Sequence, residues 1–460
     1  MATFGNAAGF PGAGAGTERR FSRATQREQV GSEQSNPTKI LQIKRYCVYI
    51  ECPFNNRTST AMNLHRRDLA IPNNWDRRGL PGWSYHNAAL LDLEKEHLFR
   101  NHWQIVGHVG DVPNAGDYLT MDVVGERALV VRGKDGVVRA FHNICRHRGS
   151  RVVAENQGSC KNALVCPFHG WVYNLDGTLR GAARPKSFPD LDKTEFGLVP
   201  LDLEIWMGLI FVRFRSGPQP PVAELMKPVE AEIAHYRIAE MTPSFGIWSQ
   251  KTPVNWKSVR DVDNEGYHVA MAHPALQDLY GATYFDEPFV NGLSRSFATY
   301  NPHAGRCWSV RNYLRLAPDP KHLPQHLKKA WIYYGIFPNM VISLMPESVQ
   351  FYQEFPLSTG ETLLRGAIYR YPDESREQAA ARYLSFRIDR ETMSEDVQLS
   401  VWSNESMMSE AFSGFYLSDL EYGVRTHHDH LRAMLPVLEL SEAPGDREMR
   451  NVNEAMLSRS

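Results

Sequence analysis

The sequence predicts an α+β protein in which a small all-β region precedes a longer region that mixes helices with strands. Three observations lead to this class. Short β-type segments separated by turn residues fill residues 104–214, a Pro-rich stretch follows at residues 216–221, and longer helical patterns alternate with strand patterns beyond it. The composition agrees, because 42% of the 460 residues are hydrophobic and 22% are charged, as in ordinary globular proteins.

Hydrophobic periodicity predicts the individual elements. Apolar residues recur at helical spacing over residues 87–103, and the β region contains two hairpin signals, Asp135-Gly136 and Asp176-Gly177. Three further helices are expected at residues 222–236, 256–268 and 375–395. Strands are expected at residues 128–132, 137–141, 172–174 and 209–214 of the β region, and at residues 310–314, 332–337, 340–344, 349–355 and 363–371 beyond it.

These patterns divide the chain into four segments. Residues 1–61 have no apolar periodicity, and we expect them to be a flexible tail or an over-extended gene start. Residues 62–103 would form an N-terminal helical part of the larger domain. The all-β domain is expected at residues 104–216, and the larger domain continues over residues 217–460.

Charge and hydropathy exclude several classes of function. Lys and Arg number 51 and Asp and Glu 52, so the chain has no electrostatic reason to bind nucleic acid or an anionic membrane. The longest apolar run, residues 205–212, is far shorter than the ~20 residues that cross a bilayer. Six cysteines are too few for a secreted disulfide framework. We therefore expect a cytoplasmic protein.

A first group of potential metal ligands lies in the β region. Cys145-x-His147 and Cys166-x-x-His169 each offer one thiolate and one imidazole in a short segment. Such a set could hold structural zinc, or a [2Fe–2S] cluster with two Cys on one iron and two His on the other. One Cys and one His in each segment suit two metals with different ligands better than the usual spacing of a zinc finger.

A second group follows the Pro-rich boundary. Glu265 and His268 share a helix face, whereas His268 and His273 are five residues apart and would diverge on a continuous helix. Both imidazoles can reach one ion only if the helix ends near His268, which Gly266 and Pro274 favour. Two His and one carboxylate form the facial set of non-haem Fe(II) oxygenases. Asp396 is the distant carboxylate candidate, although its segment alone is more typical of a solvated helix end.

Together these motifs resemble those of the α subunits of Rieske non-haem iron oxygenases, and the stretch Cys-Pro-Phe-His-Gly-Trp-Val-Tyr at residues 166–173 is especially similar. The resemblance implies an all-β Rieske [2Fe–2S] domain inserted in a helix-grip catalytic domain, an antiparallel sheet with helices. It also implies two metal centres. The cluster ligands would be Cys145, His147, Cys166 and His169, and the ligands of one mononuclear Fe(II) would be His268, His273 and Asp396.

Two acidic residues distinguish this sequence within the family. Glu265 matches the acidic residue that links a Rieske His of one subunit to an iron-ligand His of its neighbour, and most arene dioxygenases have Asp there. A glutamate resembles the branch of carnitine, glycine-betaine and stachydrine oxygenases. Asp261 stands where many relatives have Asn, and we expect it either to assist catalysis beside the iron or to be a helix-surface acid.

The resemblance implies an enzyme that uses O2 and externally supplied electrons. The leading hypothesis is monooxygenation and oxidative N-demethylation of a betaine or another N-methylated compound, with release of formaldehyde. Aromatic residues at 331–337 and 351–352 would surround the cation, and Glu347 would supply the counter-charge. Ring hydroxylation of an aromatic acid, bound by Arg306 or Arg311, is the enzymatic alternative. A Rieske electron carrier is the non-enzymatic one.

The same resemblance implies partner proteins. This chain lacks a dinucleotide-binding fingerprint, so a separate flavin or iron–sulfur reductase, with or without a ferredoxin, would deliver electrons from NAD(P)H. A homotrimer is expected, because neighbouring subunits would bring the cluster of one chain close to the iron of the next.

Overall fold

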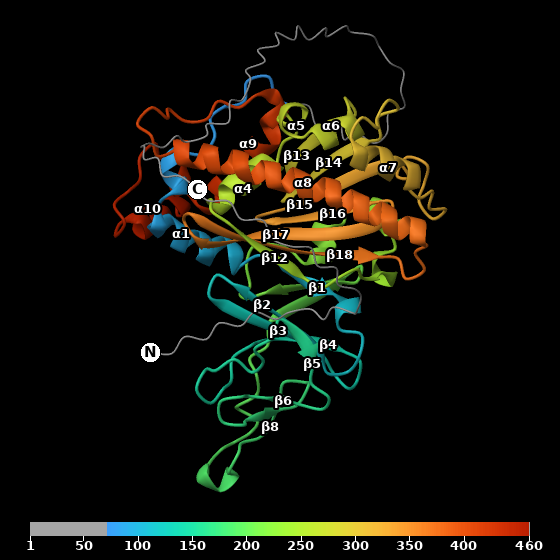
Figure 1. Cartoon of the computed structure of the whole chain (residues 1–460). Coiled ribbons are helices and arrows are strands. Elements are labelled where there is room, and N and C mark those ends of the chain that lie inside the picture. The colour runs from blue at the N-terminus through green and yellow to red at the C-terminus, as the bar shows by residue number, and fades with distance from the viewer. Residues whose placement is uncertain (1–70, 460) are drawn as a thin grey trace, which may run out of the picture. The chain divides into compact units, whose positions relative to one another are not determined.

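A computed structural model describes residues 71–459 of the chain (Figure 1). The tail expected at residues 1–61 lies outside the described residues. Within residues 71–459, no helix is both long enough and apolar enough to cross a membrane.

Ten short strands form the β region in three antiparallel sheets, which have the strand orders β1-β10-β9, β4-β3-β2-β5 and β6-β7-β8. The strands are β1 (Gln104–His108), β2 (Asp117–Val123), β3 (Glu126–Arg132), β4 (Val138–His142), β5 (Gln157–Ser159), β6 (Leu164–Val165), β7 (Val172–Tyr173), β8 (Leu179–Gly181), β9 (Asp202–Trp206) and β10 (Leu209–Arg213). The two predicted hairpins are confirmed. Asp135-Gly136 connects β3 to β4, Asp176-Gly177 connects β7 to β8, and both glycines have positive φ (78° and 88°).

One large antiparallel sheet forms the framework of the second domain, in the order β11-β18-β17-β16-β15-β14-β13 with β12 also paired to β18. Its strands are β11 (Thr242–Pro243), β12 (Trp248–Thr252), β13 (Phe285–Val290), β14 (Leu293–Thr299), β15 (Ala330–Ile336), β16 (Met340–Met345), β17 (Ser348–Ser358) and β18 (Glu361–Arg370). Side chains of β15 alternate between two hydrophobic clusters, with Trp331 in one and Tyr334 in the other, so both faces of the sheet are covered.

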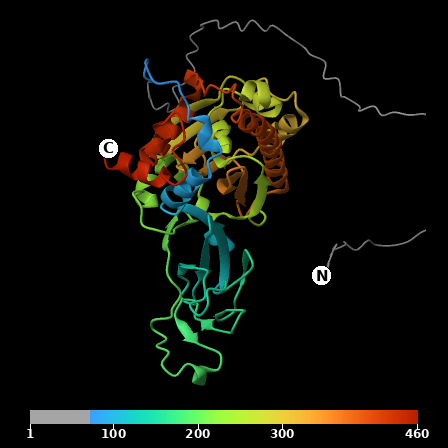
Figure 2. The same ribbon diagram turned by 90° about the vertical axis from the view of Figure 1, so that its left-hand side faces the viewer.

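Helices cover this sheet. The long α8 (Arg376–Ser406) runs across the strands in Figure 1, and Figure 2 shows it on the side opposite the C-terminal helices. A Ser375 cap with Gln378 starts α8 in a capping box. The other α-helices are α1 (Ala88–Glu94), α2 (Val222–Leu225), α3 (Glu230–Ala234), α4 (Trp256–Asp263), α5 (Val269–Ala272), α6 (Pro274–Tyr280), α7 (Trp308–Leu316), α9 (Tyr422–Met434) and α10 (Met449–Leu457).

One predicted element is wrong. Residues 310–314 were expected to form a strand, but they lie inside α7, which packs against α8. Val310 and Tyr313 are both fully buried and three residues apart, as on one face of a helix. A short apolar run does not distinguish a strand from a buried helical turn.

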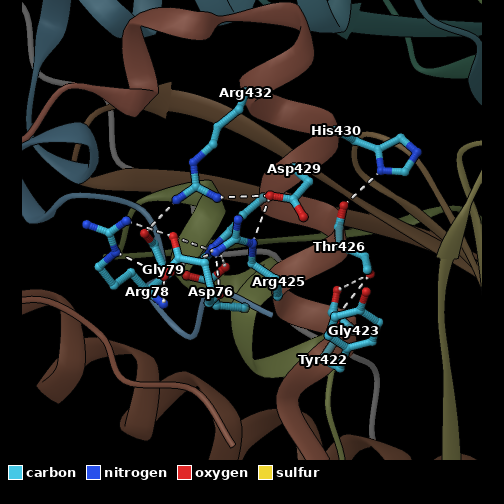
Figure 3. Close-up of polar contacts among 12 residues, drawn as sticks. Asp76, Arg78, Gly79, Tyr422, Gly423, Arg425, Thr426, Asp429, His430 and Arg432 are labelled. Atoms are coloured by element: carbon cyan, nitrogen blue, oxygen red, sulfur yellow. Dashed lines mark hydrogen bonds and ion pairs between the residues drawn. The ribbon is translucent and has the colours of Figure 1, made fainter. Parts of the chain in front are cut away.

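The first described residues are fixed to α9 by a network of charged groups (Figure 3). Arg425 forms an ion pair with Asp76 at 3.2 Å and another with Asp429 at 2.8 Å. Arg432 also pairs with Asp429 and donates to the Gly79 carbonyl oxygen at 2.7 Å. The segment that leads into α1 is therefore held against the C-terminal part of the chain.

Buried hydrogen bonds connect β1 of the β region to the large sheet. Arg365 on β18 donates to the carbonyl oxygens of Ile105 at 2.9 Å and Val106 at 2.5 Å. Gln353 on β17 also donates to Ile105 at 2.7 Å. Burial removes water from Arg365 and lowers its pKa to about 10. The carbonyl groups replace that water as hydrogen-bond acceptors for its charge.

Candidate metal centres

Two matched turns carry the ligands predicted in the β region. The amide of Gly149 donates to the carbonyl oxygen of Cys145 at 3.0 Å, and Gly170 donates in the same way to Cys166 at 3.0 Å. Gly149 and Gly170 have φ of 71° and 70°, a conformation that costs glycine little. Each turn therefore presents one Cys and one His toward the other turn.

The four side chains lie together at the end of this region. Cys145 and Cys166 are buried, and the ring centroids of His147 and His169 are 4.6 Å apart. The Tyr173 hydroxyl lies 3.3 Å from the Cys145 sulfur, and the His147 ring stacks on Trp171 with 4° between the planes. Burial raises the pKa of the Cys145 thiol.

This donor set fits a [2Fe–2S] cluster. Nδ1 of His147 is buried and has no hydrogen-bond partner among residues 71–459, which is costly for a polar atom unless another group binds it. Two thiolates and two imidazoles are the ligands of a Rieske cluster, in which the His ligands raise the reduction potential.

The second group lies where the helical pattern of residues 256–280 breaks. The α4 helix ends at Asp263, α5 begins at Val269, and α6 begins at Pro274. Gly266 sits in the first break, where a Cβ atom would lie 1.9 Å from the ring of Tyr284. The helix expected over residues 256–268 ends earlier, at Asp263, and the expected break near His268 is present. This break turns His268 and His273 toward each other.

Asp396 on α8 completes a cluster of three ligand atoms. The Nε2 atoms of His268 and His273 are 2.9 Å apart, and Oδ1 of Asp396 lies 3.3 Å and 2.8 Å from them. Ligands about 2.1 Å from one ion, at neighbouring corners of an octahedron, would be about 3 Å apart. The three atoms therefore fit a facial site for one metal ion.

Carboxylates orient both histidines through their Nδ1 atoms, the ring nitrogens that do not belong to the three-atom cluster. Nδ1 of His268 contacts Oε1 of Glu265, and Nδ1 of His273 lies 2.8 Å from Oε2 of Glu395. Although burial alone lowers the pKa of His268, its hydrogen bonds to Asp396 and Glu265 raise the pKa to about 10. The site thus stabilises positive charge, and a metal ion would displace protons from it.

A pocket with an empty volume of about 1080 Å³, its open mouth included, contains this triad. Its wall includes four tyrosines, Tyr280, Tyr284, Tyr333 and Tyr352, and five carboxylates, Asp263, Glu265, Glu354, Asp389 and Asp396.

Several predicted site residues lie elsewhere. Asp261 does not line the pocket but bonds the Tyr85 hydroxyl at 2.5 Å and Nε2 of His428 at 2.7 Å, so it joins α4 to α9 and to the segment before α1. Of the proposed cation-binding aromatic residues, Tyr333 and Tyr352 line the pocket, whereas Trp331, Tyr334, Phe337 and Phe351 do not.

The charged groups proposed for the substrate also need correction. Glu347 is buried outside the pocket lining and accepts a hydrogen bond from Tyr313 at 3.0 Å. Arg306 lines a different hollow, with Asp278 and Cys307, and Arg311 lines neither. Neither arginine is therefore placed to bind a substrate carboxylate beside the triad.

Sequence reasoning missed three carboxylates of this region: Glu395, Asp263 and Asp389. Glu395 directly precedes Asp396, but only the packing of α8 against the segment of His273 shows it as a histidine partner. Asp389 lies two helical turns before Asp396, and this seven-residue spacing places both on one face of α8.

Comparisons with known proteins agree with this geometry. Residues 102–194 match the model of the Rieske [2Fe–2S] domain, and residues 239–437 match the ring hydroxylating alpha subunit (catalytic domain).

Two curated relatives are similar at 32% identity. One is the carnitine monooxygenase oxygenase subunit of Escherichia coli (strain K12), aligned over 46% of this chain and 58% of the relative. The other is the glycine betaine monooxygenase oxygenase subunit of Pseudomonas aeruginosa (strain UCBPP-PA14), with 48% and 49% covered. The chain thus spans about half the length of these relatives.

Among solved structures, the quaternary ammonium Rieske monooxygenase CntA in complex with an inhibitor has the same fold, with a TM-score of 0.65 at 23% identity over 78% of this chain and 95% of the other. The predicted α+β class, with an all-β Rieske domain and a catalytic domain built on an antiparallel sheet with helices, is confirmed. With a Rieske [2Fe–2S] domain followed by the mononuclear-iron catalytic domain, the chain belongs to the Rieske non-haem iron oxygenases.

Proposed function

We propose that this chain is the oxygenase component of a system that monooxygenates and N-demethylates a betaine or another N-methylated cation. Oxidation of a C–H bond next to nitrogen gives a hemiaminal, which breaks its C–N bond to release formaldehyde and the demethylated amine. One oxygen atom of O2 enters formaldehyde and the other leaves as water. Two electrons from NAD(P)H and two protons complete the balance.

The observation that carries this proposal is the chemistry of the pocket wall. Tyrosine faces attract organic cations, and carboxylates supply the counter-charge. Arg260 is the single Lys or Arg side chain in the described lining, and it is occupied by Glu354 and Asp263 at 3.3 Å and 2.9 Å. The names of the relatives, carnitine and glycine betaine monooxygenase subunits, point to the same kind of substrate.

The metal ligands proposed are Cys145, His147, Cys166 and His169 for the cluster, and His268, His273 and Asp396 for the mononuclear iron. When bound, the cluster supplies single electrons and the Fe(II) supplies O2 activation. Glu265 fixes the ring of His268 through Nδ1, and Glu395 fixes the ring of His273 in the same way. Both carboxylates keep the Nε2 atoms directed at the pocket. Asp261 would hold α4 in place and not touch the substrate.

Electrons would come from a separate flavin or iron–sulfur NAD(P)H reductase, with or without a ferredoxin, in the cytoplasm.

We also propose a homotrimer in which Glu265 links the iron site of one chain to a Rieske histidine of its neighbour. Apolar side chains are exposed near both groups that this link would join. Phe168 lies beside His169 and Met271 follows His268 by three residues, with exposed fractions of 54% and 89%. A mass in solution three times the 52.4 kDa of one chain would support the trimer, and a monomeric mass would contradict it.

The test of the proposed function is product identification during turnover with an NAD(P)H-coupled reductase. N-methylated cations and aromatic acids would be supplied separately, and products would be identified by mass spectrometry. We expect a demethylated amine and an equal amount of formaldehyde from a cation. A dihydroxylated or hydroxylated ring from an aromatic acid, without any formaldehyde from the cations, would establish the ring-hydroxylating alternative instead.

The two alternatives are less well supported. Ring hydroxylation of an acid lacks a free basic group in the described pocket wall, because Arg306 and Arg311 lie outside it. An electron carrier would not need the catalytic domain that residues 239–437 match.

A further inference from the structure

Four of the five carboxylates in the pocket wall already have a strong partner. Asp396 contacts both histidines, Glu265 contacts His268, and Arg260 pairs with both Glu354 and Asp263. The fifth, Asp389, accepts a hydrogen bond from the neutral amide of Gln350 at 2.7 Å and has no cationic partner among residues 71–459. The pocket therefore contains one carboxylate whose charge is not paired.

Tyrosines surround this carboxylate. Tyr333 and Tyr280 come from β15 and α6, and their hydroxyl groups are 3.0 Å apart. Tyr352 of β17 is two residues from Gln350, so both side chains project from the same face of that strand. Burial raises the pKa of each of these three phenols, and the nearby charge of Asp389 raises it further, so all three lie within reach of its electrostatic field. A carboxylate among aromatic rings is a suitable site for an organic cation.

The spacing along α8 also suits a cation that carries its own oxidisable methyl group. Asp389 and Asp396 are separated by two helical turns, which is about 10.5 Å along the axis. A carboxylate-to-ammonium contact of about 4 Å, one bond of about 1.5 Å and a reacting-atom contact of about 3.5 Å together span about 9 Å. The two lengths are similar, so a methyl group on a nitrogen held by Asp389 would reach the triad.

A zwitterion would be bound less well by the same wall. The carboxylate of glycine betaine lies one carbon from its nitrogen, so it would enter the pocket along with the cation. Arg260 is fully buried and its Nη atoms already contact Glu354, Asp263 and Asn264. A substrate carboxylate would meet Asp389 and its neighbours without a free basic partner, which is unfavourable in a partly buried site.

We propose that Asp389 is the counter-ion of the substrate and sets its class. Because the described lining has no free basic group, Asp389 selects an N-methylated cation without an adjacent carboxylate. This inference rests on the proposed function, because it assumes that the pocket holds an N-methylated cation. It narrows the substrate class from betaines and other N-methylated compounds to methylated amines and quaternary ammonium alcohols.

The experiment measures equilibrium binding of choline and of glycine betaine to the metal-loaded full chain by calorimetry. Choline is expected to bind at least tenfold more tightly. The Asp389→Asn substitution should weaken choline binding at least tenfold and leave glycine betaine nearly unchanged, whereas Asp389→Glu should restore part of the choline affinity. The matched control is Glu391→Gln, which removes a partly exposed carboxylate, paired with Arg387 and outside the pocket wall, from the same helix and should change neither affinity. Thermal unfolding and the visible spectrum of the cluster would show that each variant is folded.

The outcomes separate this inference from the proposed function. If choline binding is the same in Asp389→Asn, or if glycine betaine binds as tightly as choline, the assignment of Asp389 is wrong while an N-methylated cation remains the substrate class. If neither cation binds and an aromatic sulfonate or carboxylate does, both the inference and the proposed function are wrong.

Discussion

His273 is a buried histidine whose two ring nitrogens face two acidic residues, Asp396 through Nε2 and Glu395 through Nδ1. Replacing it with alanine removes one of three converging ligand atoms, so we predict that His273→Ala loses the mononuclear iron. Metal analysis should then fall from about three to about two iron atoms per chain, with an unchanged visible spectrum of the cluster. His303→Ala, which alters an exposed histidine, should retain all three. A His273→Ala protein with full iron content would contradict the ligand assignment.

Glu347 is a buried carboxylate outside the pocket, and burial raises its pKa from 4.5 to about 6. The folded protein therefore binds a proton at this group more tightly than the unfolded chain does. The buried negative charge lowers the free energy of unfolding fully above pH 6, and this loss disappears as the pH falls below 4.5. Glu347→Gln keeps an acceptor for Tyr313 and removes the charge.

We therefore predict that Glu347→Gln raises the free energy of unfolding at pH 8 by up to about 2 kcal/mol and has a smaller effect at pH 5. Denaturant unfolding at both pH values measures the difference. The control Glu391→Gln, at a partly exposed carboxylate, should show no such dependence. A gain that is equal at the two pH values would mean that packing, and not the charge, sets the effect.

The sequence indicated the site residues whose type and spacing are typical of metal ligands. His268, His273 and the four cluster ligands stand in short motifs whose spacing is typical of metal binding. Glu395, Asp389 and Asp263 could not be assigned in this way, because an acidic residue on a helix is usually solvated. Only the packing of α4 and α8 shows which ones face the pocket or contact His273. Glu347 was misassigned because it lies in the turn between β16 and β17, where the sequence does not show whether a side chain faces the pocket.

Breaks between elements position the proposed metal ligands as much as the elements themselves. The helical pattern of residues 256–268 continues past Asp263, but the backbone leaves the helix before Glu265 and resumes at Val269. Gly266 and Pro274 gave the signal for this interruption. The expected strand at residues 310–314 was wrong because local propensity does not include the contact between α7 and α8.

The anchor of the first described segment on α9 gives a prediction at the same scale. Arg425 has a side chain that is 15% exposed and contacts both Asp76 and Asp429 (Figure 3). We predict that Arg425→Gln destabilises the chain by about 1 kcal/mol, because it leaves two carboxylates without their shared partner. Arg78→Gln is the control, since Arg78 is 82% exposed and pairs with Asp76 alone, and it should leave the thermal midpoint unchanged. Equal midpoints for both variants would show that the network does not anchor the segment.

At the scale of the whole molecule, two domains, each with its own set of proposed metal ligands, are joined through buried hydrogen bonds from Arg365 and Gln353 to β1. The motifs predicted both domains and their order. The path of the strands in the large sheet could not be predicted, because β11 and β12 both pair with the distant β18 and this pairing depends on contacts across more than a hundred residues.

The most direct test of the account is a single-turnover reaction of the chemically reduced, iron-loaded protein with O2 and an N-methylated cation. We predict up to one formaldehyde per chain from the wild-type protein, and none from His273→Ala with its cluster intact. Formaldehyde from the His273→Ala protein would show that the triad is not the site of oxidation. Reduced wild-type protein that gives no formaldehyde from any cation, and that hydroxylates an aromatic acid when one is supplied in place of the cation, would contradict the central claim.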